Sequence, residues 1–448
     1  MSLTRLSLFF CLLGCVVFVP AAAADEPFFP GAGNRGYDAL DYDVDLVFEP
    51  KSGRIKARTF ILARAETDLR RLSLDFRGPR IRKVRVDNRV SQFRRRDGKL
   101  VVFPRQPVDE GVLFTIDVDY RGVPPRIVDP DGTAEGWNRT DDGVIAVGEP
   151  QGTPAWIPCN NVPTDKASFS FDIKLPVGLK AVANGRRVAV AIRAGRARYH
   201  WAEGAPMSPY LAVLNIGHGK LVKSRAWGRL AWTLVDPRLA RGSRPVLEEL
   251  PRVIGFLSRL FGPYPFSSAG SLVDYAPDLG YALETQSRPI YAYVPDLTTL
   301  VHETAHQWFG NSVGLKRWPE IWLNEGFATW AQWYYAERHG DRSAKEIFER
   351  LRRVPASNEE FWNPPPGNPG TARRLFDSSI YVRGAMAVQA LREEIGTKPL
   401  LRVLRRWTSE HRYGSATIPE FIALAEAVAD RDLDPLFRRW LYQRGKPR

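Results

Sequence analysis

The segment LVHETAHQWFG places His302, Glu303 and His306 in the pattern HExxH, and Glu325 follows in the segment WLNEGFATW. Residues four apart on an α-helix lie on the same face, so both imidazoles can reach one metal ion. A catalytic zinc site needs three protein ligands and an open position, and Glu325 is the best third ligand. Glu303 lies next to a ligand without being one, so it can act as general base and then general acid. The pattern predicts a zinc hydrolase with one Zn²⁺ per chain.

Two helices must carry these residues. Apolar residues recur at helical period around the motif, which predicts a helix over residues 298–310. Pro319 is typical of a helix start, and the helix that it begins is expected to run through Glu325 to about residue 338. A strand and a loop over residues 271–293 are expected to lead into the first helix. Further helices are expected over residues 380–395 and 400–410 and in the segments PEFIALAEAV and DPLFRRWLY.

The first half of the chain has a different pattern. Segments such as YDVDLVFEP, RTFILARAET and SFSFDIKLP alternate apolar and polar residues, and turn signals such as DPDG separate them. We therefore expect an α+β multidomain protein. An N-terminal all-β domain of sandwich or saddle type spans residues 37–223, and a mainly helical catalytic domain spans residues 224–448. Residues 25–36 are expected to be a linker.

The N-terminus resembles a secretory signal peptide over residues 1–24. A short basic start at Arg5 precedes an apolar run, Pro20 breaks that run, and alanines supply a cleavage site near Ala23 and Ala24. A retained membrane anchor and a lipoprotein at Cys15 are the alternatives. We expect a secreted or extracytoplasmic protein, with no stable insertion in a membrane.

Composition narrows the class further. Removing the leader leaves Cys159 as the only cysteine, so no internal disulfide is possible, and Cys159 is expected to be a buried apolar residue. The net charge of +14 comes from arginine clusters such as those at residues 80–85 and 94–96. These clusters lack a platform of stacking aromatic residues, so we expect a solvated basic face and no nucleic-acid partner.

The run HETAHQWFGN followed by RWPEIWLNEGFATW resembles the gluzincin aminopeptidases of the aminopeptidase N family, in which HExxH is followed by eighteen residues and a Glu. The segment EPQGTPAWIPCNNVPTDKASF resembles the end of that family's β domain, and LYQRGKP resembles the end of its catalytic region. The resemblance covers nearly all of the mature chain. It implies a thermolysin-like catalytic domain and an aminopeptidase, in a short form without the family's C-terminal helical domain.

The resemblance also assigns residues one at a time. The family's Gly-x-Met-Glu-Asn motif binds the free amine of the substrate through its Glu, and Glu284 takes that place here. Glu149 in GEPQG matches a second residue that assists it, and Tyr381 in SIYVRGAM matches a tyrosine that stabilises the oxyanion. The matching loop departs from the family because Tyr281 replaces Gly and Leu283 replaces Met, with Ala282 between them. Tyr281 therefore puts the first side-chain pocket in question.

Three functions remain open at this stage. The favoured one is a monomeric aminopeptidase that acts on peptides. The second is a zinc endopeptidase with a cleft that is open at both ends. The third is a zinc-stabilised binding module without turnover, although such a module has no need of Glu303 or Tyr381.

Overall fold

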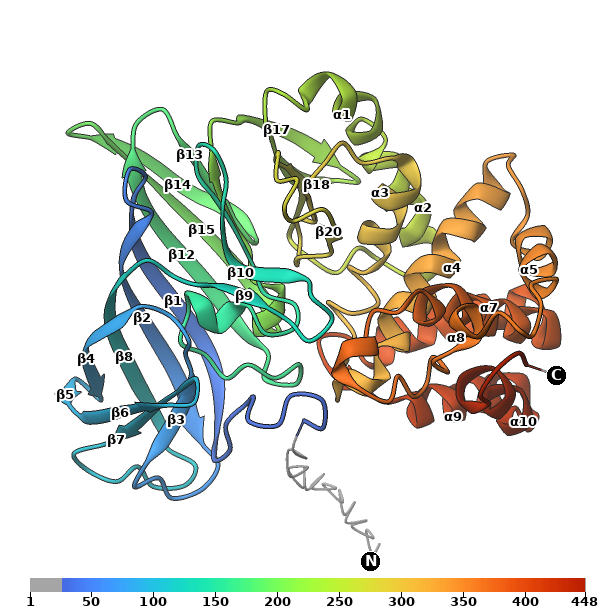
Figure 1. Cartoon of the computed structure of the whole chain (residues 1–448), viewed down its shortest axis with the longest axis horizontal. Coiled ribbons are helices and arrows are strands. Elements are labelled where there is room, and N and C mark those ends of the chain that lie inside the picture. Colours follow the sequence, from blue (N-terminus) through green and yellow to red (C-terminus); the bar gives the residue numbers. More distant parts are fainter. Residues whose placement is uncertain (1–25, 448) are drawn as a thin grey trace, which may run out of the picture.

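The computed structural model describes residues 26–447 and shows two domains in contact, an N-terminal β domain and a mainly helical C-terminal domain (Figure 1). The predicted α+β organisation is confirmed. The predicted leader lies outside the described residues. Among the helices of residues 26–447, none is long and apolar enough to cross a membrane.

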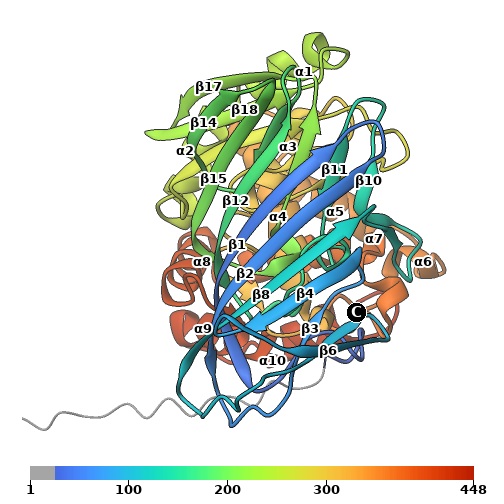
Figure 2. The ribbon, with the colours of Figure 1, turned by 90° about the vertical axis from the view of Figure 1, so that its left-hand side faces the viewer.

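The β domain is built on one large twisted sheet, seen from its outer side in Figure 2. Its strands follow the order β14 (Arg186–Arg193), β15 (Arg196–Met207), β12 (Ala167–Pro176), β1 (Tyr37–Glu49), β2 (Arg54–Ala65), β8 (Leu113–Gly122), β4 (Arg80–Val86) and β5 (Arg89–Val90). Burial along β1 and β2 largely alternates with the side-chain period of a strand, so one face turns inward. This alternation is the pattern that the sequence predicted.

Two smaller sheets cover that inner face. One contains β13 (Lys180–Ala183), β16 (Leu214–Gly217), β11 (Val144–Val147), β10 (Ala134–Arg139) and β9 (Arg126–Val128). The other contains β3 (Leu72–Asp75), β7 (Lys99–Phe103) and β6 (Gln92–Arg96). Aromatic contacts fill the space between the layers: the Trp156 ring stacks on Phe171 with 6.1 Å between centroids and is tilted against Trp137, also at 6.1 Å. The domain is therefore a packed sandwich.

The C-terminal domain begins with a third sheet, in the order β17 (Lys220–Ala226), β18 (Arg229–Val235), β19 (Ser268–Val273), β21 (Ile290–Tyr291) and β20 (Ala282–Leu283). The predicted boundary between residues 223 and 224 lies inside β17. The short strands β22 (Gly314–Leu315) and β23 (Ser415–Ala416) pair in parallel. Strand β20 is the terminal strand of the third sheet, and its residues Ala282 and Leu283 line the cavity of the candidate site.

The helices of this domain follow in chain order. They are α1 (Ala240–Leu247), α2 (Leu250–Phe261), α3 (Leu297–Ala305), α4 (Trp322–Arg338), α5 (Ala344–Arg352), α6 (Glu359–Trp362), α7 (Ser378–Ile395), α8 (Thr397–Glu410), α9 (Ile418–Ala429) and α10 (Asp434–Phe437). The predicted helices are present, but α3 ends at Ala305, five residues before the predicted end. The chain tightens there, because the N–H groups of both Trp308 and Phe309 bond to the carbonyl of Ala305. His306 consequently caps the helix.

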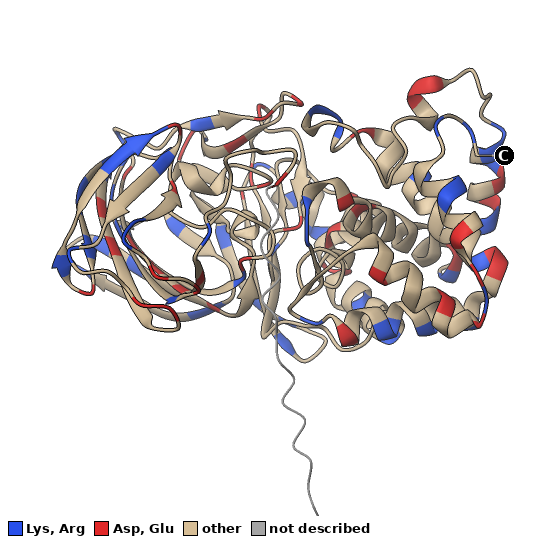
Figure 3. Ribbon diagram, turned by 90° about the horizontal axis from the view of Figure 1, so that it is seen from below, with Lys and Arg blue, Asp and Glu red and all other residues tan. Residues whose placement is uncertain are grey.

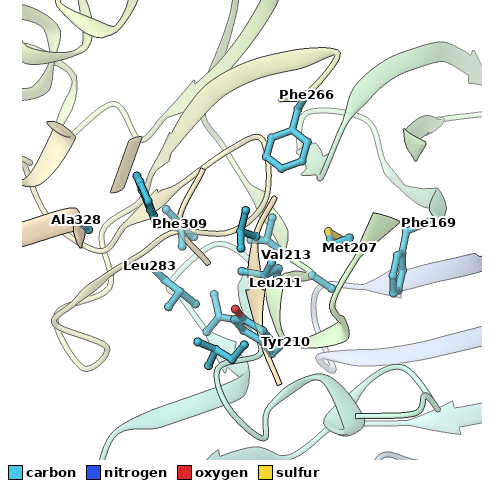
Figure 4. Packing of buried hydrophobic residues seen from close by; sticks show 14 of the residues in the cluster. Phe169, Met207, Tyr210, Leu211, Val213, Phe266, Leu283, Phe309 and Ala328 are labelled. Carbon is cyan, nitrogen blue, oxygen red and sulfur yellow. The ribbon is translucent and has the colours of Figure 1, made fainter. Parts of the chain in front are cut away.

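The apolar interior is continuous across the two domains. Figure 4 shows Leu211 and Val213 of the β domain between Met207 on one side and Leu283 and Phe309 of the catalytic domain on the other. All of these side chains are buried. The domains are thus joined by a shared core.

The N-terminal segment also contacts both domains. The carboxylate of Glu26 accepts a hydrogen bond from the N–H of Trp318 at 3.0 Å, and Phe29 meets the Trp318 ring edge-on. The N–H of Gly33 donates to Asp75 in the β domain. Residues 26–36 therefore tie the sandwich to the segment that leads into α4.

The two arginine clusters of the sequence lie on β4, near one end of the large sheet, and on β6, the terminal strand of the three-stranded sheet. Figure 3 shows that basic and acidic residues are interleaved along the strands and on the outer helices. Arg85 forms ion pairs with Asp117 and Asp119 on the neighbouring strand β8. Part of the basic charge is thus neutralised by neighbours on the sheet.

Candidate metal centre and active site

His302, His306 and Glu325 meet where α3 packs on α4. The Nε2 atoms of the two histidines are 3.0 Å apart, and Oε2 of Glu325 lies 3.2 Å from His302 Nε2 and 3.4 Å from His306 Nε2. All three residues are buried. Nδ1 of His306 lies 3.1 Å from the carbonyl of Phe309, which can only accept, so in the neutral imidazole Nδ1 carries the proton and the lone pair of Nε2 faces the cluster.

This donor set fits zinc. Bonds of about 2.0–2.1 Å in a tetrahedral arrangement put ligand atoms about 3.3 Å apart, close to the three distances observed. Two imidazole nitrogens and one carboxylate are a common ligand set of catalytic zinc. Burial alone would raise the pKa of Glu325, but His306 and His302 together lower it to about 2. The negative charge of Glu284 and Glu325 outweighs burial and raises the pKa of His306 to about 10, so the site favours positive charge.

The helix bearing Tyr381 approaches α4 because two glycines meet. A Cβ on Gly326 of α4 would lie 3.1 Å from the carbonyl carbon of Gly384 on α7, so larger residues would separate the helices. Trp322 donates from its ring N–H to the Gly384 carbonyl at 3.0 Å. This close contact places the Tyr381 ring 6.0 Å from the His302 ring, between centroids. Burial raises the pKa of Tyr381 well above its usual value, so its hydroxyl keeps its proton.

Arg383, two residues after Tyr381, fixes the N-terminal half of α7. Its guanidinium is fully buried and donates to the carbonyls of Trp440, Gly445 and Gln443 near the end of the described chain. Another bond reaches the carbonyl of Trp362. The position of α7 therefore depends on the segment over residues 439–445.

Two further carboxylates face the same cavity. Glu284 follows β20, and Glu149 comes from the loop after β11 in the β domain. Both are buried, and Glu149 Oε1 and Glu284 Oε1 accept no hydrogen bond from any described residue. Burial and the charge of Glu284 raise the pKa of Glu149 well above its usual value. Glu284 Oε1 is 3.9 Å from Nδ1 of His306, so the carboxylate of Glu284 lies next to a metal ligand.

Tyr281 bridges the two domains at the rim of the cavity. Its hydroxyl donates to the carbonyl of Ala134 on β10 at 2.7 Å. The next residue on β10, Glu135, accepts from the N–H of Gln151, which lies two residues after Glu149. The loops that carry Glu284 and Glu149 are thus both attached to β10.

The structure brings the sequence-predicted site residues together around one cavity of about 180 Å³. Its lining includes Glu303 and all of the others: Glu149, Tyr281, Ala282, Leu283, Glu284, His302, His306, Glu325 and Tyr381. Thr133 and Phe376 also line it and were not expected, because neither lies in a recognisable motif. A larger cavity of about 570 Å³ between β17–β18 and α1–α2 contains none of the predicted residues.

The sequence matches two domains of one known protein family. Residues 39–211 match the Peptidase M1 N-terminal domain, and residues 285–440 match the Peptidase family M1 domain. The chain belongs to the M1 family of peptidases. The resemblance drawn from the zinc motif is thereby confirmed.

Individual relatives are distant in sequence but close in fold. A leucyl aminopeptidase of Saccharolobus solfataricus is 23% identical over 91% of this chain and 53% of its own length. An aminopeptidase N of Lactococcus lactis is 26% identical over 65% of this chain and 37% of its own. The M1 zinc metallopeptidase of Deinococcus radiodurans has a TM-score of 0.85 at 26% identity, covering 94% of this chain and 98% of that one. The present chain spans about half the length of the curated relatives that it matches.

Proposed function

We propose that this M1 peptidase is a zinc aminopeptidase that removes single residues from the N-terminus of peptides. The observation that carries the proposal is the pair of buried carboxylates, Glu149 and Glu284, which have oxygens without a hydrogen-bond partner among the described residues and line the same cavity as the three metal ligands. Such a pair suits a substrate ammonium group. Relatives named as aminopeptidases support the same activity. A variant of the Deinococcus radiodurans enzyme bound to a Tyr-Ser-Ala substrate supports peptides as the substrate class.

The chain's own residues supply the remaining chemistry. A bound Zn²⁺ would lower the pKa of a water molecule and polarise the substrate carbonyl. Glu303 is buried beside His306 and Glu284 and lies outside the cluster of His302, His306 and Glu325, so its carboxylate can take a proton from the water and return it to the leaving amine. The Tyr381 hydroxyl donates to the oxygen that becomes negative in the transition state. Glu149 and Glu284 hold the ammonium group and so orient the first peptide bond.

The experiment compares Glu303→Gln with the wild type on aminoacyl arylamides and on matched peptides with free and acetylated N-termini. We expect the variant to retain zinc and to lose a factor of about 10³ or more in kcat, because the proton transfer is lost. We expect the wild type to cleave only the peptide with the free amine. Unchanged turnover by the variant would refute the role of Glu303, and efficient cleavage of the acetylated peptide would refute the roles of Glu149 and Glu284.

We also propose that the enzyme works outside the cytoplasm. The leader pattern of residues 1–24 supports this proposal. Fractionation of expressing cells, with N-terminal sequencing of the exported protein, tests it. A full-length chain retained in the cytoplasm would contradict the proposal.

A further inference from the structure

Two buried amide side chains hold the backbone of Glu284. Its carbonyl oxygen accepts from Nδ2 of Asn311 at 2.7 Å and from Nε2 of Gln307 at 3.1 Å. Oε1 of Gln307 accepts in turn from the N–H of Ser287 at 2.7 Å. Gln307 and Asn311 are at most 1% exposed. The loop over residues 284–287 is therefore fixed at both of its ends.

These amides belong to the same turn as a metal ligand. Gln307 directly follows His306, and the N–H of Asn311 donates to the His306 carbonyl at 3.1 Å. The turn is braced from the β domain, because Lys166 donates from Nζ to the carbonyls of Asn311 and Ser312. His306 and the backbone of Glu284 are thus mounted on one rigid unit.

The two amides leave the Glu284 carboxylate available. They bond to its backbone oxygen, whereas Oε1 of its side chain has no hydrogen-bond partner among residues 26–447. Gln307 and Asn311 consequently determine where the carboxylate lies without competing for its ligand. This arrangement suits positioning better than direct binding.

The position matters because it selects the bond that is cut. Successive residues of an extended peptide are spaced by about 3.3–3.6 Å, so a shift of the amine site by that length moves cleavage from the first peptide bond to the second. We propose that Gln307 and Asn311 are positioning residues that set the cleavage register, and this inference rests on the proposed aminopeptidase function. They restrict the products to single amino acids.

The test uses the zinc-loaded full chain with Asn311→Leu and Gln307→Met. Gln389→Met is the control, because Gln389 is another buried amide and bonds to Trp330 and Glu393 instead of the loop. A hexapeptide with a free N-terminus is digested, and its early products are quantified by mass spectrometry. Titration calorimetry measures the binding of L-leucinamide and of its N-acetyl derivative.

We expect the wild type and the control to release single residues, with the control only less stable. Compared with the wild type, Asn311→Leu and Gln307→Met should each release at least ten times more dipeptide relative to single residues. Both should also bind L-leucinamide about tenfold more weakly. N-acetyl-leucinamide lacks the free amine, so it should bind the wild type more weakly than L-leucinamide does. Its affinity should be the same in the wild type and in Asn311→Leu and Gln307→Met. A purely structural role would lower stability without changing the product ratio.

Single-residue products together with wild-type affinity for L-leucinamide in both loop variants would overturn the inference. If Asn311→Leu does not fold, Asn311→Asp takes its place, since it keeps the size of the side chain and replaces the donating amide with an acceptor. A wild type that does not cleave peptides with free amines would instead refute the proposed function. The two failures are therefore distinguishable.

Discussion

Glu203 provides a test of how burial affects the stability of the domain junction. This residue lies on β15, is fully buried, and accepts from the N–H of Ala205 at 3.0 Å through Oε1. Its other oxygen, Oε2, has no partner among the described residues. Burial raises the pKa of Glu203 to about 7, although the Ala205 bond and Arg288 act in the opposite direction.

The raised pKa predicts a pH-dependent loss of stability. An unfolded Glu has a pKa of about 4.3, so between about pH 4.3 and 7 the native state holds a proton that the unfolded state has released. Stability from this group is therefore greatest below pH 4.3 and falls as the pH rises to 7. The difference between the two pKa values corresponds to about 3.7 kcal/mol above pH 7. Glu203→Gln cannot ionise and avoids this penalty.

The assay is urea unfolding of the wild type and Glu203→Gln, followed by tryptophan fluorescence at pH 5 and pH 8. We expect the variant to be more stable than the wild type at pH 8, with its free energy of unfolding relative to the wild type about 2.5 kcal/mol higher at pH 8 than at pH 5. Taking the difference between proteins at each pH cancels the effect of pH on zinc binding, which the two share. A difference that is the same at both pH values would refute the reasoning.

Three further predictions concern the site and its supports. Tyr381→Phe should lower kcat about 10²–10³-fold with a small change in KM, and unchanged kcat would exclude the oxyanion role. Lys166→Met removes the ammonium donor to the carbonyls of Asn311, Ser312 and Gly414, of which Gly414 still accepts from the N–H of Gly314, so the free energy of unfolding should fall by about 3 kcal/mol in urea titrations. Chelation should abolish hydrolysis and lower the Tm, and added Zn²⁺ should restore both; a Tm that does not respond to metal would contradict the three-ligand site.

The parts of the site that depend only on helical periodicity and on nearby residues could be predicted from the sequence. The spacing of His302 and His306 needs only one turn of helix, and α4 was expected because its start and its apolar residues are local signals. The end of α3 could not be predicted, because it depends on the bonds made by the following turn. The alternating strands were recognisable, but the order in which they pair is set by contacts between distant segments.

Contacts between distant residues explain what the sequence could not reveal. Tyr281 and Ala134 are far apart in the chain, and their hydrogen bond exists only after both domains have folded. Nothing in the pattern around Gln307 or Asn311 indicates that both amides bond to the Glu284 carbonyl. The family domains match residues 39–211 and 285–440, so the unusual loop over residues 281–284 falls between them.

The dependence of α7 on Arg383 has a consequence for biosynthesis. Its guanidinium is held by carbonyls from residues 439–445, which are translated well after the metal ligands and after Glu149 and Glu284. A nascent chain can therefore assemble the zinc cluster before Tyr381 has a fixed position. Full peptidase activity is expected only once residues 439–445 have folded against Arg383.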